Sequence, residues 1–128
     1  MEKNPLISII IPNFNRAHLI SETLESIRNQ TYKHWECIVV DDHSIDNSWA
    51  IVDDYCKKDK RFKQVKRPNE LPKGACSCRN YGFEISKGLY VNWFDSDYIM
   101  ISDKLEKQLE QLLKTESDVV VCQTQTCV

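Results

Sequence analysis

The chain lacks both a long apolar run and a secretory signal. No stretch of its 128 residues approaches the ~20 apolar residues that a membrane-spanning helix needs. The apolar run that follows Pro5 is too short for the core of a signal peptide with a cleavage site. The sequence therefore predicts a cytoplasmic protein without a transmembrane segment, with the inner face of the membrane as the alternative place of action.

The sequence also lacks a metal-binding cysteine pattern and a strong charge of one sign. Its six cysteines show no C-x-x-C spacing, and no histidine accompanies them at zinc-finger distance. Reduced thiols are the better interpretation, with Cys37 and Cys122 as small buried hydrophobic residues. The net charge of −2 gives no general attraction to nucleic acid, so no nucleic-acid partner is expected. The one basic stretch, from Lys57 to Arg67, is interpreted as a solvated surface.

Internal repeats and low-complexity segments are absent as well, and the composition is that of an ordinary globular domain. Hydrophobic residues make up 41% of the chain and charged residues 28%, which argues against disorder. A chain of this size buries roughly two-thirds of its unfolded surface, enough for a real core. We therefore expect one domain, or part of one, over residues 1–128.

Strand and helix patterns alternate along the chain. Short apolar runs predict buried strands at 6–11, 35–40, 62–65, 89–94 and 118–122. Apolar residues at helical spacing predict helices at 18–29, 48–57, 75–86 and 102–113. This alternation predicts an α/β fold of the Rossmann-like kind, with a mostly parallel sheet and helices on both faces.

The most informative motif is Asp95-Ser96-Asp97, which directly follows a predicted buried strand. Carboxylates this close repel each other, and a bound divalent cation such as Mg²⁺ removes that cost. Because Asp-x-Asp also occurs by chance, its interpretation depends on the other strand ends. Polar segments also follow the first three strands, beginning at Pro12, Asp41 and Pro68. Ligands of open α/β sheets bind at these carboxyl ends.

Several of these polar residues have both a functional and a structural interpretation. Lys73 and Arg79 could offset the charge of a diphosphate. Arg79 could equally lie on the surface of its helix, and Asp41 and Asp42 could cap a helix or form a turn. Strand alternation places Trp93 in the core.

Six segments in this order and spacing resemble the family 2 glycosyltransferases of the GT-A fold. They are residues 8–15, 24–31, 36–44, 78–82, 87–90 and 95–97, and the resemblance extends over about residues 7–113. The resemblance implies a GT-A domain that binds a nucleotide-diphospho-sugar, with a UDP-sugar expected. It also implies a saccharide or lipid-linked acceptor.

The resemblance further implies nucleotide-sugar contacts at all four strand ends. The matching positions are Pro12, Asn13, Asn15, Asp42, Lys73, Gly74, Arg79, Asp95 and Ser96. Among them, Asp42 is expected at the base and Asp95 at the ribose. Asp97, together with Asp95, is expected to hold Mn²⁺ or Mg²⁺.

The sequence departs from the family pattern at two residues and in its length. His43 stands where glycine is frequent, and Tyr98 stands where a further acid is frequent. Family catalytic domains are longer, and their second half carries the acceptor contacts and the general base. No candidate base follows Asp118, so we expect the general base beyond Val128.

The resemblance therefore implies the donor-binding part of an inverting glycosyltransferase. Because the general base is expected outside residues 1–128, these residues alone should show weak or no transfer. The alternative is a nucleotide-binding module without turnover.

Two other protein classes fit the sequence less well. A receiver-type signalling domain carries its acid pair after the first strand, where this chain has Pro12-Asn13. A nucleotidyltransferase that forms nucleotide-sugars uses a glycine-rich, basic loop at that position. Residues 12–16 contain no glycine and a single arginine.

Overall fold

The computed structural model describes residues 4–115, and in this range strands and helices alternate without exception. The strands are β1 (Ile7–Asn13), β2 (Trp35–Asp41), β3 (Phe62–Lys66) and β4 (Tyr90–Trp93). The helices are α1 (Ile20–Arg28), α2 (Ser48–Lys58), α3 (Ala75–Ile85) and α4 (Lys104–Thr115). Each agrees with its predicted range to within a few residues. The predicted strand 118–122, Cys122 and Val128 lie outside the described residues.

The strands form one parallel sheet in the order β3-β2-β1-β4. The chain adds β2 and β3 on one side of β1 and then returns to place β4 on the other side. The strand order therefore switches between β1 and β4. The carboxyl ends of the strands at such a switch point are the usual ligand site of an open α/β sheet.

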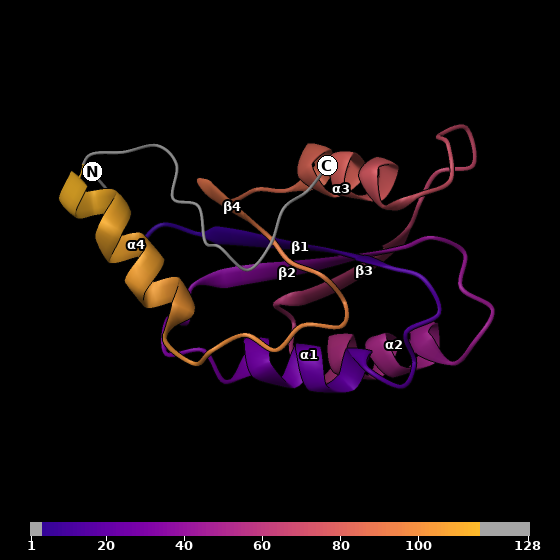
Figure 1. The fold of residues 1–128 in the computed structure, drawn as a ribbon, viewed down its shortest axis with the longest axis horizontal. Coiled ribbons are helices and arrows are strands. Elements are labelled where there is room, and N and C mark those ends of the chain that lie inside the picture. Colours follow the sequence, from indigo (N-terminus) through magenta and orange to yellow (C-terminus); the bar gives the residue numbers. More distant parts are fainter. Residues whose placement is uncertain (1–3, 116–128) are drawn as a thin grey trace.

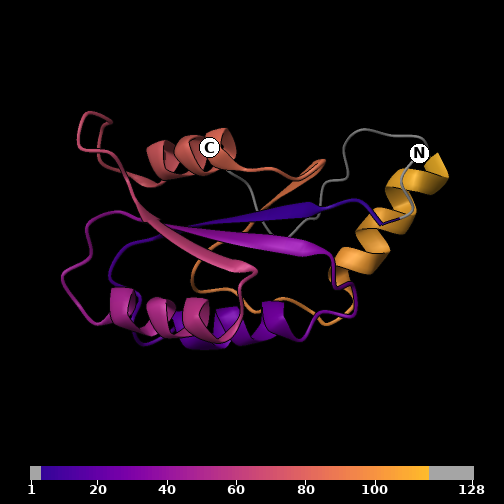
Figure 2. The ribbon, with the colours of Figure 1, turned by 180° about the vertical axis from the view of Figure 1, so that it is seen from behind.

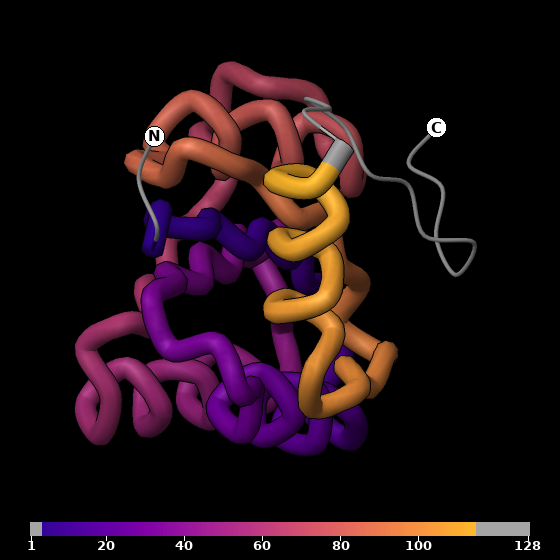
Figure 3. The backbone as a smooth tube through the Cα atoms, turned by 90° about the vertical axis from the view of Figure 1, so that its left-hand side faces the viewer, coloured from indigo at the N-terminus to yellow at the C-terminus, as the bar shows by residue number. Residues whose placement is uncertain are grey.

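Helices cover both faces of this sheet, as the alternation of elements predicts. In Figure 1, α3 lies above the sheet and α1 and α2 lie below it, and Figure 2 shows the same layers from behind. Helix α4 lies at the end of the molecule that faces the viewer in Figure 3. Among the described residues, no helix is both long enough and apolar enough to span a membrane.

Alternate side chains of the two central strands build two separate cores. Ile7, Ile9 and Ile11 of β1, with Trp35, Cys37 and Val39 of β2, join the larger core, to which α1, α2 and α4 also contribute. Ile38 and Val40 join the smaller core with Cys78 of α3. Full burial of an aliphatic side chain contributes about 1.5–3 kcal/mol, so both faces of these strands favour apolar residues.

Strand β1 continues through Pro12, although the predicted strand ends one residue before this proline, at position 11. The Ile10 carbonyl accepts a hydrogen bond from the Phe94 N–H, so the main chain of residues 10 and 12 faces β4. Pairing between β1 and β4 stops at Ile10 and Trp93. The missing N–H of Pro12 therefore falls where β4 has already diverged, and no ladder hydrogen bond is lost.

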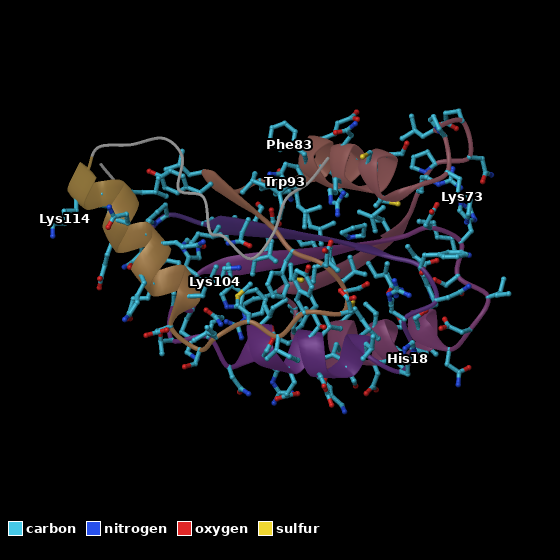
Figure 4. All side chains as sticks on the ribbon, in the orientation of Figure 1. His18, Lys73, Phe83, Trp93, Lys104 and Lys114 are labelled. Atoms are coloured by element: carbon cyan, nitrogen blue, oxygen red, sulfur yellow. The ribbon has the colours of Figure 1, made fainter. Side chains whose placement is uncertain are left out.

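The prediction that Trp93 lies in the core is wrong. β4 is an edge strand of the described sheet, and Trp93 is 36% exposed. Its ring contacts that of Phe83 on α3, with 6.1 Å between the ring centroids, and Figure 4 shows the two side chains together. Strand alternation gives the face on which a side chain lies, but α3 covers that face only partly.

Candidate functional site

A cavity of about 270 Å³ lies at the switch point between β1 and β4. Its walls come from the ends of β1 and β4, from the residue after β2 and from the first turns of α3. The lining residues are Pro12, Asn13, Phe14, Arg16, Asp42, Ala75, Cys78, Arg79, Asp95, Ser96 and Asp97. The ends of β1, β2 and β4 therefore meet at one cavity, as expected for a parallel sheet, whereas the segment after β3 does not line it.

Most of the predicted site residues line this cavity. They are Pro12, Asn13, Asp42, Arg79, Asp95, Ser96 and Asp97. The other three, Asn15, Lys73 and Gly74, do not line it. The cavity is also lined by Phe14, Arg16, Ala75 and Cys78, which the sequence did not single out as site residues. Phe14 and Arg16 belong to the strand-end segment 12–16, so their position was a usable signal.

The acid pair shares its wall of the cavity with a buried arginine. Arg79 donates from Nη2 to Asp95 Oδ1 at 2.9 Å, and its side chain is 10% exposed. The alternative that Arg79 lies on the surface of α3 is therefore wrong. Ala75 is the first residue of α3 and lines the same cavity, so the positive end of the helix dipole is close to it. This wall offers positive charge to an anionic ligand.

Asp95 and Asp97 are the carboxylates available to a divalent cation. The described residues include no group of three or more His, Cys, Asp or Glu side chains that could hold a metal ion. Mg²⁺ in phosphate sites commonly takes one or two carboxylates, and its other ligands are phosphate oxygens and water. The pair therefore fits an ion shared with a diphosphate rather than an ion held by protein ligands alone.

Asp42 is buried and held from two sides. Its Oδ1 accepts from Arg67 Nε at 2.5 Å, and its Oδ2 accepts from the Gly74 N–H at 3.1 Å. The interpretation of Arg67 as part of a solvated surface is wrong, because this side chain is 9% exposed. The buried carboxylate compensates its charge. The partners lie 25 positions apart, beyond the reach of local sequence patterns.

Asp41, in contrast, organises a turn. Its Oδ2 accepts from the Ser44 N–H at 2.8 Å, and its Oδ1 accepts from Ser44 Oγ at 2.6 Å. The turn-forming alternative therefore holds for Asp41. His43 in the same turn has φ 60°, a conformation that glycine adopts easily. This explains why glycine and His43 can occupy equivalent positions.

The three predicted residues outside the cavity position the loops around it. The Asn15 N–H donates to Ser44 Oγ at 3.0 Å and so ties the loop after β1 to the loop after β2. Lys73, labelled in Figure 4, places its Nζ 3.7 Å from the centroid of the Phe14 ring. Gly74 has φ 135°, which side-chain-bearing residues rarely adopt, and it directly precedes α3.

Cys78 contributes a neutral thiol to the cavity wall. Burial raises the pKa of Cys78 to about 11, and the negative charge of Asp42 adds to the effect. The thiol is therefore protonated at neutral pH. A protonated thiol is a poor nucleophile and a poor metal ligand, so Cys78 acts here as a small apolar surface.

A sequence profile described as "Glycosyl transferase family 2" matches residues 8–127. The chain is 40% identical over 109 residues to UDP-Glc:alpha-D-GlcNAc-diphosphoundecaprenol beta-1,3-glucosyltransferase WfgD of Escherichia coli, covering 85% of this chain and 42% of that protein. It is 41% identical over 110 residues to the putative teichuronic acid biosynthesis glycosyltransferase TuaG of Bacillus subtilis (strain 168), covering 86% and 43%. The chain thus spans less than half the length of these relatives, and the expectation of a general base beyond Val128 stays a prediction.

Solved structures share the fold. S. aureus TarS 1–349 in complex with UDP-GlcNAc matches with a TM-score of 0.80 and 28% identity, over 88% of this chain and 32% of TarS. The mannosyltransferase PcManGT from Pyrobaculum calidifontis, in complex with GDP-Man and Mn²⁺, matches with a TM-score of 0.75 and 25% identity, over 85% and 32%. The predicted GT-A-like α/β fold is confirmed. Since the profile covers nearly the whole sequence, the chain belongs to glycosyl transferase family 2.

Proposed function

We propose that this chain is the donor-binding part of an inverting glycosyltransferase that uses a nucleotide-diphospho-sugar, with a UDP-sugar as the expected donor. The observation that carries the proposal is the single cavity at the switch point. It combines Asp42 and the ring of Phe14 with Arg79, the start of α3 and the acid pair. A nucleoside diphosphate needs this combination of base contacts and positive charge. The E. coli relative is named for UDP-Glc, and TarS was solved with UDP-GlcNAc.

Each wall of the cavity contacts a different part of the proposed ligand. The Asp42 carboxylate accepts hydrogen bonds from N–H groups of the base, and the ring of Phe14, a residue that is 41% exposed, offers a stacking surface. Asp95 accepts from a ribose hydroxyl. Arg79 balances the charge of the diphosphate through charge-assisted hydrogen bonds.

Asp97, with Asp95, is proposed to hold Mn²⁺ or Mg²⁺ beside the diphosphate. When bound, a divalent ion supplies neutralising charge to the leaving diphosphate. The ion pair with Arg79 holds Asp95 in place and lowers the cost of bringing it close to Asp97. PcManGT, solved with GDP-Man and Mn²⁺, supports a metal in this family.

In an inverting transfer, an acceptor hydroxyl attacks the anomeric carbon while a general base takes its proton. The bond between that carbon and the diphosphate oxygen breaks, and its electron pair leaves with the diphosphate. We assign the general base and the acceptor contacts to positions beyond Val128, in the part of the longer relatives that this chain does not cover. A saccharide or lipid-linked acceptor is proposed. The diphosphoundecaprenol in the name of the E. coli relative supports a lipid-linked acceptor. Action at the inner face of the membrane is part of the proposal.

Thermal unfolding with UDP, GDP, CDP and ADP, each with and without Mn²⁺, tests the donor site. A ligand at about 100 times its dissociation constant adds about 2.7 kcal/mol of stability. For a domain of this size, the midpoint should rise by roughly 5–15 °C. We expect the largest rise with UDP and Mn²⁺ together. No rise with any nucleotide in the presence of Mn²⁺ would contradict the proposal.

The substitution Asp97→Asn tests the metal assignment. It keeps the size of the side chain but removes its charge, so we expect the Mn²⁺ dependence of the UDP-induced shift to disappear. Asp54→Asn is the matched control, because Asp54 is an exposed carboxylate of α2 that pairs with Lys58 outside the cavity. An Asp97→Asn chain that binds UDP and Mn²⁺ like the parent would show that the metal is held elsewhere.

A further inference from the structure

Arg67 connects the cavity wall to the loop that leads into α3. Its Nε donates to Asp42 Oδ1, and its Nη1 donates to the carbonyl oxygens of Pro68 at 3.1 Å and Leu71 at 2.6 Å. The side chains of Arg67 and Asp42 are 9% and 7% exposed. One buried guanidinium therefore fixes a carboxylate of the cavity and the following loop at the same time.

The main chain of Arg67 is fixed as well. Its N–H donates to the Asp41 carbonyl at 2.9 Å, and its own carbonyl lies 2.8 Å from Nε2 of His43. These contacts hold Arg67 against the end of β2 and the turn that follows it. The guanidinium therefore extends from an anchored backbone, and its position is set by the sheet.

The contacts of Arg67 and Asp42 close a ring. From Arg67 the loop runs to Gly74, whose N–H returns to Asp42 Oδ2 at 3.1 Å. Asp42 in turn accepts from Arg67. Because α3 begins at the residue after Gly74, the ring also fixes the start of the helix whose first turns line the cavity.

Arg67 is the buried cation of this ring. Lys73 also approaches Asp42, but its Nζ is 3.8 Å from Oδ2 and its side chain is 59% exposed. Without Arg67, the buried Asp42 carboxylate would keep only the Gly74 N–H and this distant lysine among its described donors. A buried carboxylate with so little compensation reorients towards water.

We propose that Arg67 is a positioning residue of the donor site, which orients the Asp42 carboxylate and the start of α3 and thereby sets the preference for the nucleotide base. The effect on the base rests on the proposed function, whereas the hold of Arg67 on the loop does not. Arginine suits this role because Nε and Nη1 of its planar group reach different partners at once. The lysine side chain has a single nitrogen and so cannot reproduce this planar arrangement of donors.

The hold of Arg67 on the loop is tested first, by measuring amide hydrogen exchange in the 128-residue chain without any ligand. Arg67→Gln is expected to speed exchange of the Gly74 amide at least about tenfold, because its acceptor is released. Arg61→Gln is the matched control. Arg61 also bonds a carboxylate, Asp59, and a carbonyl, that of Lys33, but it lies at the other end of β3. Unchanged exchange at Gly74 in Arg67→Gln overturns the proposal.

Nucleotide binding is tested next by calorimetry with UDP and GDP in the presence of Mn²⁺. Arg67→Gln is expected to weaken UDP binding at least about tenfold. It should also reduce the difference between the affinities for UDP and for GDP. Arg61→Gln should match the parent in both. Guanidinium added to Arg67→Ala should restore part of the UDP affinity, a result that a general loss of stability cannot produce. If Arg67→Gln binds UDP and GDP with the affinities of the parent, Arg67 does not set the base preference.

Two further outcomes separate the proposals. A parent chain that binds no nucleotide contradicts the donor site, while hydrogen exchange still decides whether Arg67 holds the loop.

If Arg67→Gln does not fold, Arg67→Lys tests whether the arginine is needed to hold the loop. It keeps a cation beside Asp42 but should lose the hydrogen bond to the Leu71 carbonyl, so we expect faster exchange of the Leu71, Lys73 and Gly74 amides. If the loop amides of Arg67→Lys exchange as in the parent and its affinity for UDP is unchanged, arginine is not required at this position and the proposal is wrong.

Discussion

At the scale of single residues, Glu36 shows how one buried carboxylate joins several elements. It lies in β2 and is 4% exposed. Its Oε2 accepts from Ser8 Oγ at 2.6 Å and from the Lys87 N–H at 2.7 Å, and its Oε1 accepts from Lys63 Nζ at 2.8 Å. Burial raises the pKa of Glu36, but the hydrogen bonds from Lys63, Ser8 and Lys87 together outweigh it and hold the pKa below its usual value.

This lowered pKa predicts a pH dependence of stability. Because the folded-state pKa lies below the unfolded one, ionised Glu36 stabilises the fold above its unfolded pKa. That contribution is lost as the pH falls through the folded-state pKa. Glu36→Gln should therefore lower the unfolding free energy by about 1–3 kcal/mol near neutral pH and flatten its decline in acid. Urea unfolding over the acid range measures both effects.

Glu110→Gln is the control for this prediction, because Glu110 is an exposed glutamate of α4. A change within about 0.5 kcal/mol is expected there. If Glu36→Gln keeps the acid dependence of the parent, the hydrogen bonds of Glu36 do not contribute to the pH dependence of stability.

At the scale of elements, α1 and Gln30, two residues after its end, hold the acid-pair motif and the segment that follows it. Thr23, Ser26 and Gln30 recur at helical spacing and contact the main chain of residues 96–105. Thr23 Oγ1 donates to the Ser96 carbonyl at 2.9 Å. Ser26 Oγ accepts from the Met100 N–H at 2.9 Å. The Gln30 amide makes two bonds: Nε2 donates to the Ile101 carbonyl at 2.6 Å, and Oε1 accepts from the Leu105 N–H at 3.1 Å. This gives a physical reason why segment 24–31 belongs to the family pattern.

The substitution Thr23→Val tests this role of α1. It removes the hydroxyl that bonds to Ser96 but keeps the shape of the side chain. We expect a loss of about 1 kcal/mol in stability and a weaker Mn²⁺-dependent response to UDP, because the acid pair loses a support. Thr31→Val makes the same change at an exposed position and should alter neither. A loss of stability with an unchanged response to Mn²⁺ and UDP would limit Thr23 to a structural role.

At the scale of the whole molecule, the sequence predicts what depends on local patterns. The strands and helices follow from apolar runs and helical spacing, and the cavity follows from the shared edge of a parallel sheet. The mispredicted features depend on neighbours distant in sequence. Trp93 is exposed because α3 covers β4 only partly, Pro12 fits because β4 has diverged, and Arg67 is buried because Asp42 lies beside it. No periodicity encodes such contacts.

Donor binding and sugar transfer should separate in this chain, because it spans 42% of the E. coli relative. We expect residues 1–128 to bind a UDP-sugar with Mn²⁺ but to show weak or no transfer of sugar to a saccharide or lipid-linked acceptor. Calorimetry measures the binding, and release of UDP in the presence of acceptor measures the transfer. The E. coli enzyme provides the positive control. Measurable transfer would show that the general base lies within residues 1–128 and not beyond Val128.

The switch in strand order also has a consequence for folding. The cavity needs β4 beside β1, and this pairing joins Ile7 to Tyr90, 83 positions further along the chain. Contacts between such distant positions form slowly, because a long loop must close before they stabilise anything. A chain in which only β1, β2 and β3 had paired would have no such cavity, because residues 95–97 would not lie beside the end of β1. The pairing of β1 with β4 is therefore the folding step that completes the proposed donor site.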